Sequence, residues 1–553
     1  MEPLDRNKWL LLTSSVGVLA LLAVAAFQEN VLVEWRQIQS RATVDHAPIA
    51  VQLRQIVNPG LGTADRCVSC HVAMAPGEQS VIGPGMQAHP PVVHDPGEFG
   101  CTVCHGGQGR ATVKADAHGA VPFWPEPMLP VRMSQAGCGT CHVATRVPRH
   151  AALVAARATF ERLDCLACHR VDGRGGTIRP DGGGMEGPDL SRAGLAGYDR
   201  DWYAGHTARA SMAAPGPWTI SFGPVTEADR AEVDRYLATR VGAPRLIEAK
   251  SVFLSSGCLG CHKVSGVGGD EGPDLTRGGE KDPARVDFTA VRGDRTVANW
   301  LSAHARAPWA VVAGSQMPAL ALTDDTVEAL TFYTLSLRRR TIVDTYLPRD
   351  RVRVTRFGER EFEADGASLY GAFCAGCHGR QGEGHRSPGM FAFPSVANPD
   401  FLAVAPDALI AATIRDGRPG RRMRAWGDGS AGLTVDDVPA LVAYLRALGG
   451  TPAPSDPRPP RWATGNADDG ARLFAGSCAG CHGPNGEGGE GPALNNPVLL
   501  EHATDTFFAE TIARGRRGTG MGGFVEPSPA RRTLSRGEIE SIVTFIRSWG
   551  GPS

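Results

Sequence analysis

Aromatic residues are scarce in this sequence: phenylalanine, tryptophan and tyrosine together make up 7% of its 553 residues. Glycine and proline are abundant, with 69 and 41 copies. A chain of this length is expected to form several domains. So few aromatic side chains are not enough to fill several ordinary hydrophobic cores. The composition fits a protein in which bulky apolar cofactors fill the interior and Gly/Pro-rich loops wrap around them.

The sequence also has almost no net charge, because 57 basic residues balance 58 acidic residues to give a formal charge of −1. Nothing in this balance indicates nucleic acid or a strongly anionic surface as a partner.

No cysteine is left over for a disulfide, a catalytic nucleophile or an iron–sulfur cluster. All 14 cysteines belong to seven copies of the pattern Cys-x-x-Cys-His, which lie at Cys67–His71, Cys101–His105, Cys138–His142, Cys165–His169, Cys258–His262, Cys374–His378 and Cys478–His482. Two thiols at this spacing can add across the two vinyl groups of one haem, and the following histidine is then held beneath the iron. Zinc sites would have to pair the motifs, and seven is odd; thioredoxin-like redox pairs do not need a histidine after every second cysteine.

The sequence therefore predicts seven covalently bound haem c groups. Their attachment residues are Cys67, Cys70, Cys101, Cys104, Cys138, Cys141, Cys165, Cys168, Cys258, Cys261, Cys374, Cys377, Cys478 and Cys481. The proximal iron ligands are His71, His105, His142, His169, His262, His378 and His482. No catalytic residue is predicted.

A single long apolar run stands near the N-terminus. Trp9–Phe27 is a stretch of 19 uncharged residues behind a head that carries Arg6 and Lys8. It can just cross a bilayer as a helix, with the head inside. A cleaved signal peptide is the alternative, because Ala23-Val24-Ala25 resembles a cleavage site. We expect a retained anchor in the bacterial cytoplasmic membrane, with the bulk of the chain on the periplasmic side, where haem is attached to this motif.

The first three motifs begin only 34 and 37 residues apart, which leaves no room for separate domains. A specific string of motifs runs through this segment, at residues 65–67, 89–90, 94, 99–101, 107–112, 116–119, 124–129 and 138–142. By these residues the segment resembles part of the membrane-associated multihaem cytochromes that accompany quinol-oxidising complexes. The resemblance implies histidines on the distal side of the irons and favours His89, His94 and His118, without pairing them with particular haems. The alternative for each is a surface histidine near a haem propionate. Met86, Met128 and Met133 are expected to be packing residues.

The last four motifs begin 93, 116 and 104 residues apart, a repeat on the scale of a domain. Each repeat has a helix leading into the motif, a Gly/Pro loop, a methionine and a closing helix. The leading helices are expected at 151–163, 245–255, 366–373 and 469–475, and the closing helices begin at the cap residues Thr226, Thr323, Thr434 and Ser535. The closing helices carry Tyr236, Tyr333, Tyr444 and Phe545 on their apolar faces.

This repeat resembles class I cytochrome c, in which a methionine is the distal ligand and raises the reduction potential. The resemblance assigns that role to Met212, Met317, Met423 and Met521. Gly-Pro loops after the proximal histidine also fit at residues 187–190, 272–275 and 491–494. The sixth site departs from the pattern with Phe393-Pro394-Ser395, which leaves its proximal loop in doubt.

The expected fold is mainly α: an N-terminal transmembrane helix, a compact multihaem segment and four tandem class I cytochrome c-like α domains. The expected boundaries are 1–40 for the anchor and its helical extension, 41–149 for the three-haem segment, 150–243 and 244–341 for the fourth and fifth haem domains, 342–450 for a connector and the sixth, 451–461 for a Pro-rich linker and 462–553 for the seventh. The linker would let the last domain move as an electron-delivery head.

Arginines crowd the loops around Met423 and Met521. They either neutralise haem propionates or form a basic rim for an acidic redox partner.

Electron transfer is the favoured function. The expected partners are the membrane, an integral membrane b-type cytochrome with a Rieske subunit or an alternative quinol-oxidising complex, and a small soluble cytochrome c or copper protein as acceptor. The alternative is a periplasmic multihaem reductase or peroxidase, which needs one open haem site. A redox sensor is disfavoured because no signalling domain is visible.

Overall fold

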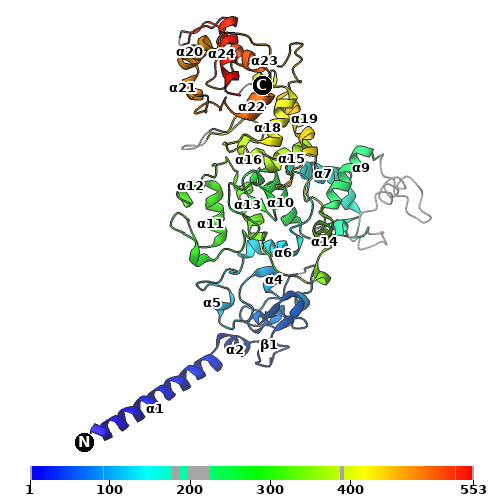
Figure 1. Ribbon diagram of the computed structural model, residues 1–553. Helices are drawn as coiled ribbons and strands as arrows, with labels where there is room; N and C mark the ends of the chain where they lie inside the picture. The colour runs from blue at the N-terminus through cyan, green and yellow to red at the C-terminus, as the bar shows by residue number, and fades with distance from the viewer. Residues whose placement is uncertain are drawn as a thin grey trace, which may run out of the picture. The chain divides into compact units, whose positions relative to one another are not determined.

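The computed structural model of the chain describes residues 3–90, 92–176, 187–195, 225–386, 392–529 and 531–550 (Figure 1). The described part is mainly helical, as predicted, and its sheets are four two-stranded antiparallel hairpins. The chain forms two compact units. The first contains residues 1–143, 277–300 and 334–352, and the second contains residues 144–276, 301–333 and 353–553.

Helix α1 (Pro3–Asn30) is the long N-terminal apolar helix that the sequence predicts. Its segment Asp5–Asn30 has a mean hydropathy of 2.4 in its most apolar part, and none of that part is buried inside the protein. By length and composition such a helix can cross a bilayer. A signal sequence meets the same criterion.

The first unit is rich in loops and poor in long elements. After α1 come α2 (Glu34–Gln39), the hairpins β1–β2 (Thr43–Val44, Ala47–Pro48) and β3–β4 (Ile56–Asn58, Thr63–Asp65), and the short helices α3 (Pro96–Phe99), α4 (Thr102–His105), α5 (Lys114–Ala117) and α6 (Gly139–His142). Its 3-10 turns are η1 (Pro59–Leu61), η2 (Cys67–Ser69), η3 (Val72–Met74), η4 (Val131–Cys138), η8 (Pro283–Arg285) and η9 (Asp344–Tyr346). One apolar cluster consists only of Ala42, Val72, Ala73 and Val81, with Met86 packed against it as a packing residue.

The second unit contains long helices as well as helices of four to six residues. They are α7 (His150–Arg162), α9 (Glu227–Ala238), α10 (Pro244–Ser255), α12 (Pro308–Val311), α15 (Gly366–Phe373), α16 (Ala375–His378), α17 (Pro399–Leu402), α18 (Asp407–Asp416), α19 (Val438–Gly449), α20 (Ala467–Ser477), α21 (Ala479–His482), α22 (Pro497–His502), α23 (Asp505–Arg514) and α24 (Arg536–Ser548). It also has the turns η5 (Cys165–Ala167), η6 (Ala193–Leu195), η7 (Cys258–Gly260) and η10 (Val435–Asp437) and the hairpins β5–β6 (Arg170–Val171, Arg174–Gly175) and β7–β8 (Lys263–Val264, Val267–Gly268). Helices α11 (Val297–Arg306), α13 (Asp324–Ser336) and α14 (Arg349–Phe357) contain residues of both units.

In each of the four repeats, an aromatic ring of the leading helix meets the aromatic ring that the sequence places on the closing helix. The ring centroids are 4.7–5.6 Å apart in the pairs Phe160–Tyr236, Phe253–Tyr333, Tyr370–Tyr444 and Phe474–Phe545. These distances suit favourable aromatic contacts. The scarce aromatic residues are therefore used where the two helices of a repeat cross.

The closing helices begin where the cap residues predict. The Thr226 hydroxyl accepts a hydrogen bond from the Asp229 N–H at 3.1 Å at the start of α9. At the start of α24, Ser535 and Glu538 form a reciprocal capping box. Because these bonds satisfy N–H groups that the helix itself cannot, the local sequence fixes where each closing helix starts.

The Pro-rich linker ends against the last repeat. The Arg461 guanidinium at its end donates hydrogen bonds to the carbonyls of Leu500, Glu501 and Ala503. The sixth and seventh repeats also touch directly, because the Asn398 amide donates to the Arg517 carbonyl and the Asn496 amide donates to the Pro419 carbonyl. The mobility of the last domain as an electron-delivery head stays a prediction.

Candidate haem-binding sites

The Cys-x-x-Cys-His motifs fold as short helical turns. In six of them the histidine N–H donates to the carbonyl of the first cysteine at 2.8–3.0 Å, and the remaining motif, Cys138–His142, runs from the end of η4 into α6. Residues three and four positions apart lie on the same face of such a turn. Both sulfurs and the imidazole of a motif therefore face the same side, as attachment to one haem requires.

Burial disfavours the thiolate form, which redox and zinc chemistry both use, at several of the cysteines. It raises the pKa of Cys138, Cys258 and Cys374 to about 12, and that of Cys165 and Cys478 to about 11. Within the described residues, no three or more His, Cys, Asp or Glu side chains are arranged to hold a metal ion.

The proximal histidines of the last four sites share one orientation. Their Nδ1 atoms lie 2.8–2.9 Å from a proline carbonyl oxygen in the pairs His169–Pro188, His262–Pro273, His378–Pro394 and His482–Pro492. A carbonyl can only accept, so Nδ1 carries the proton and Nε2 keeps its lone pair. This is the arrangement that orients a histidine for a metal, with the second nitrogen hydrogen-bonded to the backbone.

The sixth site follows the same rule despite its different loop sequence. Pro394 supplies its carbonyl to His378 at 2.8 Å, although Phe393 replaces the glycine that precedes the proline at the other sites. Where that glycine is present, it lies against the imidazole: an added Cβ at Gly187, Gly272 or Gly491 would be 2.4, 2.6 or 2.8 Å from the ring carbon Cε1. Burial also lowers the pKa of His262, His378 and His482, which favours the neutral imidazole that binds metals.

In the first unit each proximal histidine has a second histidine for a neighbour. The rings of His89 and His105 have centroids 6.1 Å apart with planes at 72°, and those of His94 and His142 are 6.2 Å apart with planes at 26°. The third pair is His71 with His118, whose proximity adds to burial in lowering the pKa of His71. The structure thus brings His89 beside His105 and His94 beside His142, and it places His118 near enough to His71 to lower the pKa of His71.

One candidate distal histidine, His89, is oriented by the same kind of hydrogen bond as the motif histidines of the last four sites. Nδ1 of His89 lies 2.7 Å from the carbonyl oxygen of Pro90, its neighbour in the sequence. Nδ1 therefore donates its hydrogen to the backbone carbonyl, and the unprotonated Nε2 keeps the lone pair that can bind a metal.

Asp65 positions the second motif from the end of strand β4. Its buried carboxylate accepts hydrogen bonds from the N–H groups of Cys101 and Thr102 at 2.5 and 2.8 Å, and from the Thr102 hydroxyl at 2.9 Å. A Cβ added at Gly100 or Gly109 would lie 2.6 or 1.9 Å from an oxygen of this carboxylate, so the space beside Asp65 requires glycine at both positions. Asp65, Gly100 and Gly109, which are among the residues that carry the resemblance of this segment, thus form the cap of the second attachment turn.

The distal loops of the sixth and seventh sites are built alike. Helices α18 and α23 end at glycines of positive φ, and the next residue donates its N–H to the methionine carbonyl at 2.7 Å, from Arg418 to Met423 and from Arg516 to Met521. Both methionines and Met317 are partly buried. The fourth candidate, Met212, lies outside the described residues. The equivalent hairpins give Met423 and Met521 equivalent positions in their domains.

The arginines of these loops separate into three groups, the third being Arg421 alone, which is exposed and forms no ion pair among the described residues. Most are paired within the protein: Arg415 with Asp416, Arg422 with Glu271, Arg424 with Asp270, Arg514 with Glu510 and Arg517 with Asp400. Arg418 and Arg516 form no ion pair with a carboxylate in the described part of the chain, and burial lowers the pKa of each guanidinium to about 10. A partly buried cation is costly without an anion beside it. A haem propionate would supply that charge, whereas the paired arginines leave little of a free docking rim.

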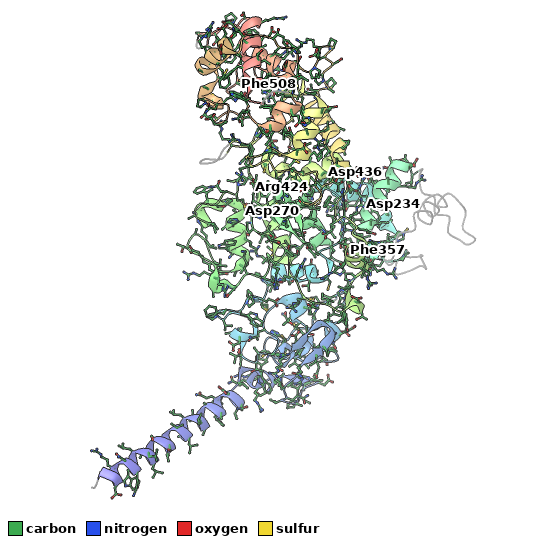
Figure 2. All side chains as sticks on the ribbon, viewed as in Figure 1. Asp234, Asp270, Phe357, Arg424, Asp436 and Phe508 are labelled. Atoms are coloured by element: carbon green, nitrogen blue, oxygen red, sulfur yellow. The ribbon has the colours of Figure 1, made fainter. Side chains whose placement is uncertain are left out.

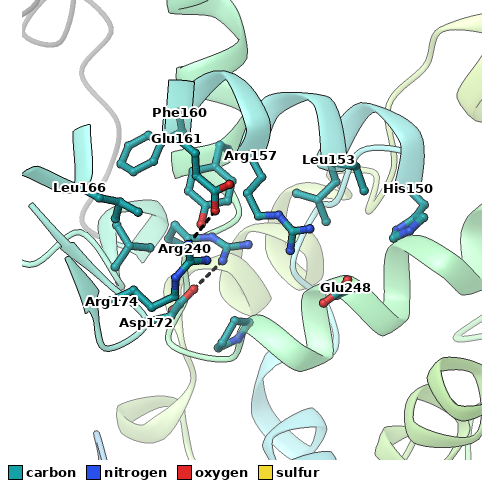
Figure 3. A pocket seen from close by; sticks show the side chains of 14 residues that line it. His150, Leu153, Arg157, Phe160, Glu161, Leu166, Asp172, Arg174, Arg240 and Glu248 are labelled. Atoms are coloured by element: carbon teal, nitrogen blue, oxygen red, sulfur yellow. Dashed lines mark hydrogen bonds and ion pairs between the residues drawn. The ribbon is translucent and has the colours of Figure 1, made fainter. Parts of the chain in front are cut away.

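A cavity of about 190 Å³ lies beside α7 and next to the fourth motif, to which its lining residue Leu166 belongs. It is lined by residues of α7, by Leu166, and by side chains that include Asp172, Arg240 and Glu248 (Figure 3). The pair Arg240–Asp172 at 2.7 Å and the pair Arg174–Glu161 at 3.0 Å neutralise charges along its wall. Its lining includes no haem-attaching cysteine and no motif histidine.

Comparison with known proteins agrees with this geometry. Residues 247–338 and 467–549 match the family model for cytochrome c, and residues 362–445 match that for subunit III of cbb3-type cytochrome c oxidase. Three such domains in one chain define a multihaem c-type cytochrome, with covalently bound haem c as cofactor and electron transfer as function.

The curated relatives are subunits of cbb3-type cytochrome c oxidases. The chain is 28% identical over 198 residues to FixP of Bradyrhizobium diazoefficiens, which covers 34% of this chain and 61% of the relative. It is 30% identical over 196 residues to FixP of Azorhizobium caulinodans, covering 34% and 60%. The chain thus spans about three fifths of the length of these relatives. A solved structure, a reducing HAO-like protein complex of Kuenenia stuttgartiensis, matches 33% of this chain and 94% of its own at 21% identity; its TM-score of 0.23 carries no argument.

Sequence reasoning missed three kinds of residue at these sites. The role of Pro394 follows from its place after a proximal histidine and before a serine, but the missing glycine hid it. Asp65 lies 36 residues before the turn it caps, so no local pattern connects them. Arg418 and Arg516 stand out among the arginines only through burial, although their equal distance of five residues from the methionines was a usable signal.

Proposed function

We propose that this chain is a membrane-anchored heptahaem cytochrome that takes electrons from a quinol-oxidising complex and passes them towards periplasmic acceptors. The observation that carries this proposal is the pairing of His89 with His105 and of His94 with His142 in the first unit. Metal–imidazole bonds are about 2 Å long, so two imidazoles on opposite sides of one iron have ring centroids about 6 Å apart. The pairs at 6.1 and 6.2 Å match that separation.

Two ligand classes follow from this reading. His118, His89 and His94 are the distal ligands of the first, second and third haems, opposite His71, His105 and His142. The last four haems have histidine on one side and Met212, Met317, Met423 or Met521 on the other. Thioether ligands favour ferrous iron and raise the potential relative to a second imidazole. Along the sequence, the low-potential sites therefore come first, after the N-terminal anchor, and the higher-potential sites follow towards the C-terminus.

When bound, each haem c supplies a one-electron Fe(III)/Fe(II) couple. The protein's part is to hold and tune these groups. The proline carbonyls at the last four sites make the proximal imidazoles more basic, and both axial positions at each site are assigned to side chains of this chain.

A multihaem reductase or peroxidase would instead need an iron with an open position. The histidine pairs argue against one in the first unit. This observation favours a conduit over an enzyme.

A second candidate function is electron delivery to a terminal oxidase. It is favoured by the match of residues 362–445 to subunit III of cbb3-type oxidases and by the relatives, which are subunits of such oxidases. The two candidates differ in the complex that holds the chain, and agree that it carries electrons between partners.

The test is to solubilise the native membranes and identify the complex that contains the chain. We expect quinol to reduce its haems in that complex, and a quinol-site inhibitor acting on a partner subunit to block the reduction. The purified chain alone should exchange electrons with a small soluble cytochrome or copper protein but should not oxidise quinol.

Two outcomes would count against the proposal. Isolation with an oxidase and without any quinol-oxidising subunit would favour the second candidate. Rapid turnover of peroxide or nitrite by the purified chain, together with a high-spin haem signal, would favour the enzyme.

A further inference from the structure

The attachment motifs of the fifth and sixth haems touch each other. The sulfur atoms of their second cysteines, Cys261 and Cys377, lie 3.9 Å apart although 116 residues separate them in the sequence. Both residues belong to the second unit. The contact joins the points at which each haem would be bonded to the protein.

Glycines allow the two motifs to approach this closely. Gly257, just before the fifth motif, has a positive φ of 74°, and an added Cβ there would lie 1.8 Å from the nitrogen of Gly376 inside the sixth motif. In the opposite direction, a Cβ on Gly376 would lie 2.4 Å from the carbonyl oxygen of Gly257. Gly260 meets the carbonyl of Phe373 in the same way, at 2.7 Å. The two attachment turns are therefore in backbone contact and leave no room for side chains between them.

Further contacts fix this interface around the motifs. The Arg422 and Arg424 side chains of the sixth repeat pair with Glu271 and Asp270 of the fifth at 2.6 and 2.8 Å; Asp270 and Arg424 are labelled in Figure 2. The Gly268 N–H donates to the Ala431 carbonyl at 2.9 Å. Each exposed ion pair contributes little alone, with measured values of about 0–1 kcal/mol. Together with the packing of α10 against α15, they hold the two repeats in one register.

We infer that Cys261 and Cys377 place the haems of the fifth and sixth sites edge to edge at their thioether bonds, so that these two haems act as one coupled pair. The inference rests on the proposed electron-transfer function and adds which haems are direct neighbours. The repeats of the sixth and seventh sites meet differently, through their distal loops, where Asn398 bonds to Arg517 and Asn496 to Pro419.

Close coupling of two irons has two physical consequences. One electron moves from Fe(II) at one site to Fe(III) at the other without a bond change or a proton, and its tunnelling rate rises exponentially as the edges approach. The unpaired spins of two ferric irons also interact through space. Both effects are measurable in the full-length protein.

The first experiment uses electron paramagnetic resonance (EPR) on the full-length wild-type protein. The signals of the fifth and sixth haems are identified as those lost in the Met317→Ala and Met423→Ala variants. In a redox titration, one of these two haems stays oxidised longer than the other. We expect its EPR signal to be broadened and fast-relaxing in the fully oxidised protein. It should narrow when its partner is reduced in a redox titration.

The second experiment uses a matched pair of glycine variants. Gly376 and Gly480 occupy the same position in two identical Cys-Ala-Gly-Cys-His motifs, but nothing lies within 4 Å of a Cβ built on Gly480. Gly376→Val should push the fifth and sixth motifs apart. It should slow electron equilibration between the two haems at least tenfold in pulse-radiolysis kinetics, while Gly480→Val stays within twofold of wild type.

Magnetically isolated fifth and sixth haems in the wild type would overturn the inference, as would a disulfide between Cys261 and Cys377. Equal kinetics in the two glycine variants would also contradict it. If Gly376→Val fails to bind its full haem complement, the wild-type titration alone decides. A protein with all its haems six-coordinate but with no coupling of this pair would leave the proposed function intact.

Discussion

The histidine pairs of the first unit differ in one measurable way, the angle between their rings. It is 72° for His89–His105 and 26° for His94–His142. Near-perpendicular imidazoles give a ferric haem a highly anisotropic low-spin EPR signal, and near-parallel imidazoles give a rhombic one. We therefore expect one signal of each kind from the second and third haems.

Single variants assign these signals. His89→Ala should abolish only the highly anisotropic signal, and His94→Ala should abolish only the rhombic one. His46→Asn is the control, since asparagine tolerates the left-handed backbone of His46, and should change neither. Loss of the same signal in both alanine variants would show that the pairing is wrong.

A second residue-scale prediction concerns the partly buried arginine of the sixth distal loop. If a haem propionate balances Arg418, then Arg418→Gln removes a positive charge near that iron and stabilises its ferric form. We expect a lower reduction potential for the sixth haem, equivalent to about 1–2 kcal/mol for charges about 10 Å apart at an effective dielectric constant of about 20. Redox titration measures the shift. Arg415→Gln, which removes an exposed arginine paired with Asp416, should leave the potential unchanged.

At this scale, the attachment residues and motif histidines could be read from the sequence, because their spacing along the chain is itself the chemical requirement. The pairing of His118, His89 and His94 with particular irons could not be read. It depends on how loops of the first unit fold in space, and several histidines were available within the same short segment.

Among the elements, the crossing of leading and closing helices is the feature that sequence patterns captured best. Cap residues and helix periodicity are local, so the helix limits in the four repeats follow from neighbouring residues. The contact between the fifth and sixth motifs is not local. It requires Gly257 and Gly376, which are 119 positions apart in the sequence, to lie against each other, and no repeat in the sequence indicates that they do.

The helix crossing gives an element-scale prediction for the last repeat. The Phe474 ring on α20 is 1% exposed and packs against Phe545 and Trp549 of the α24 region. Phe474→Ala should destabilise this repeat by about 3–5 kcal/mol, the usual cost of removing a buried phenylalanine side chain. Thermal unfolding followed at the seventh haem should show a lower midpoint.

Phe357 provides the matched control, since its ring is 74% exposed and it is labelled in Figure 2. Phe357→Ala should leave the unfolding midpoint unchanged. Equal midpoints for the Phe474 and Phe357 variants would mean that the helix crossing does not hold the last repeat together.

For the whole molecule, helix α1 decides whether the protein stays in the membrane. Its exposed apolar side chains predict that the full-length chain needs detergent, whereas a chain starting at Val31 should be soluble with an unchanged haem spectrum. Membrane fractionation and N-terminal sequencing check this. A mature N-terminus near Ala26 or Phe27 would show that the helix is a cleaved signal.

The account as a whole depends on seven haems that each have two protein ligands. The most direct measurement is an EPR spectrum of the fully oxidised full-length protein, with spins counted against the haem-to-protein ratio. We expect about seven low-spin ferric haems per chain, of two ligand classes, and no high-spin signal. A high-spin signal that integrates to about one haem per chain would reveal an iron with an open position and contradict the electron-transfer function. A haem-to-protein ratio well below seven would contradict the prediction that each of the seven motifs binds a haem.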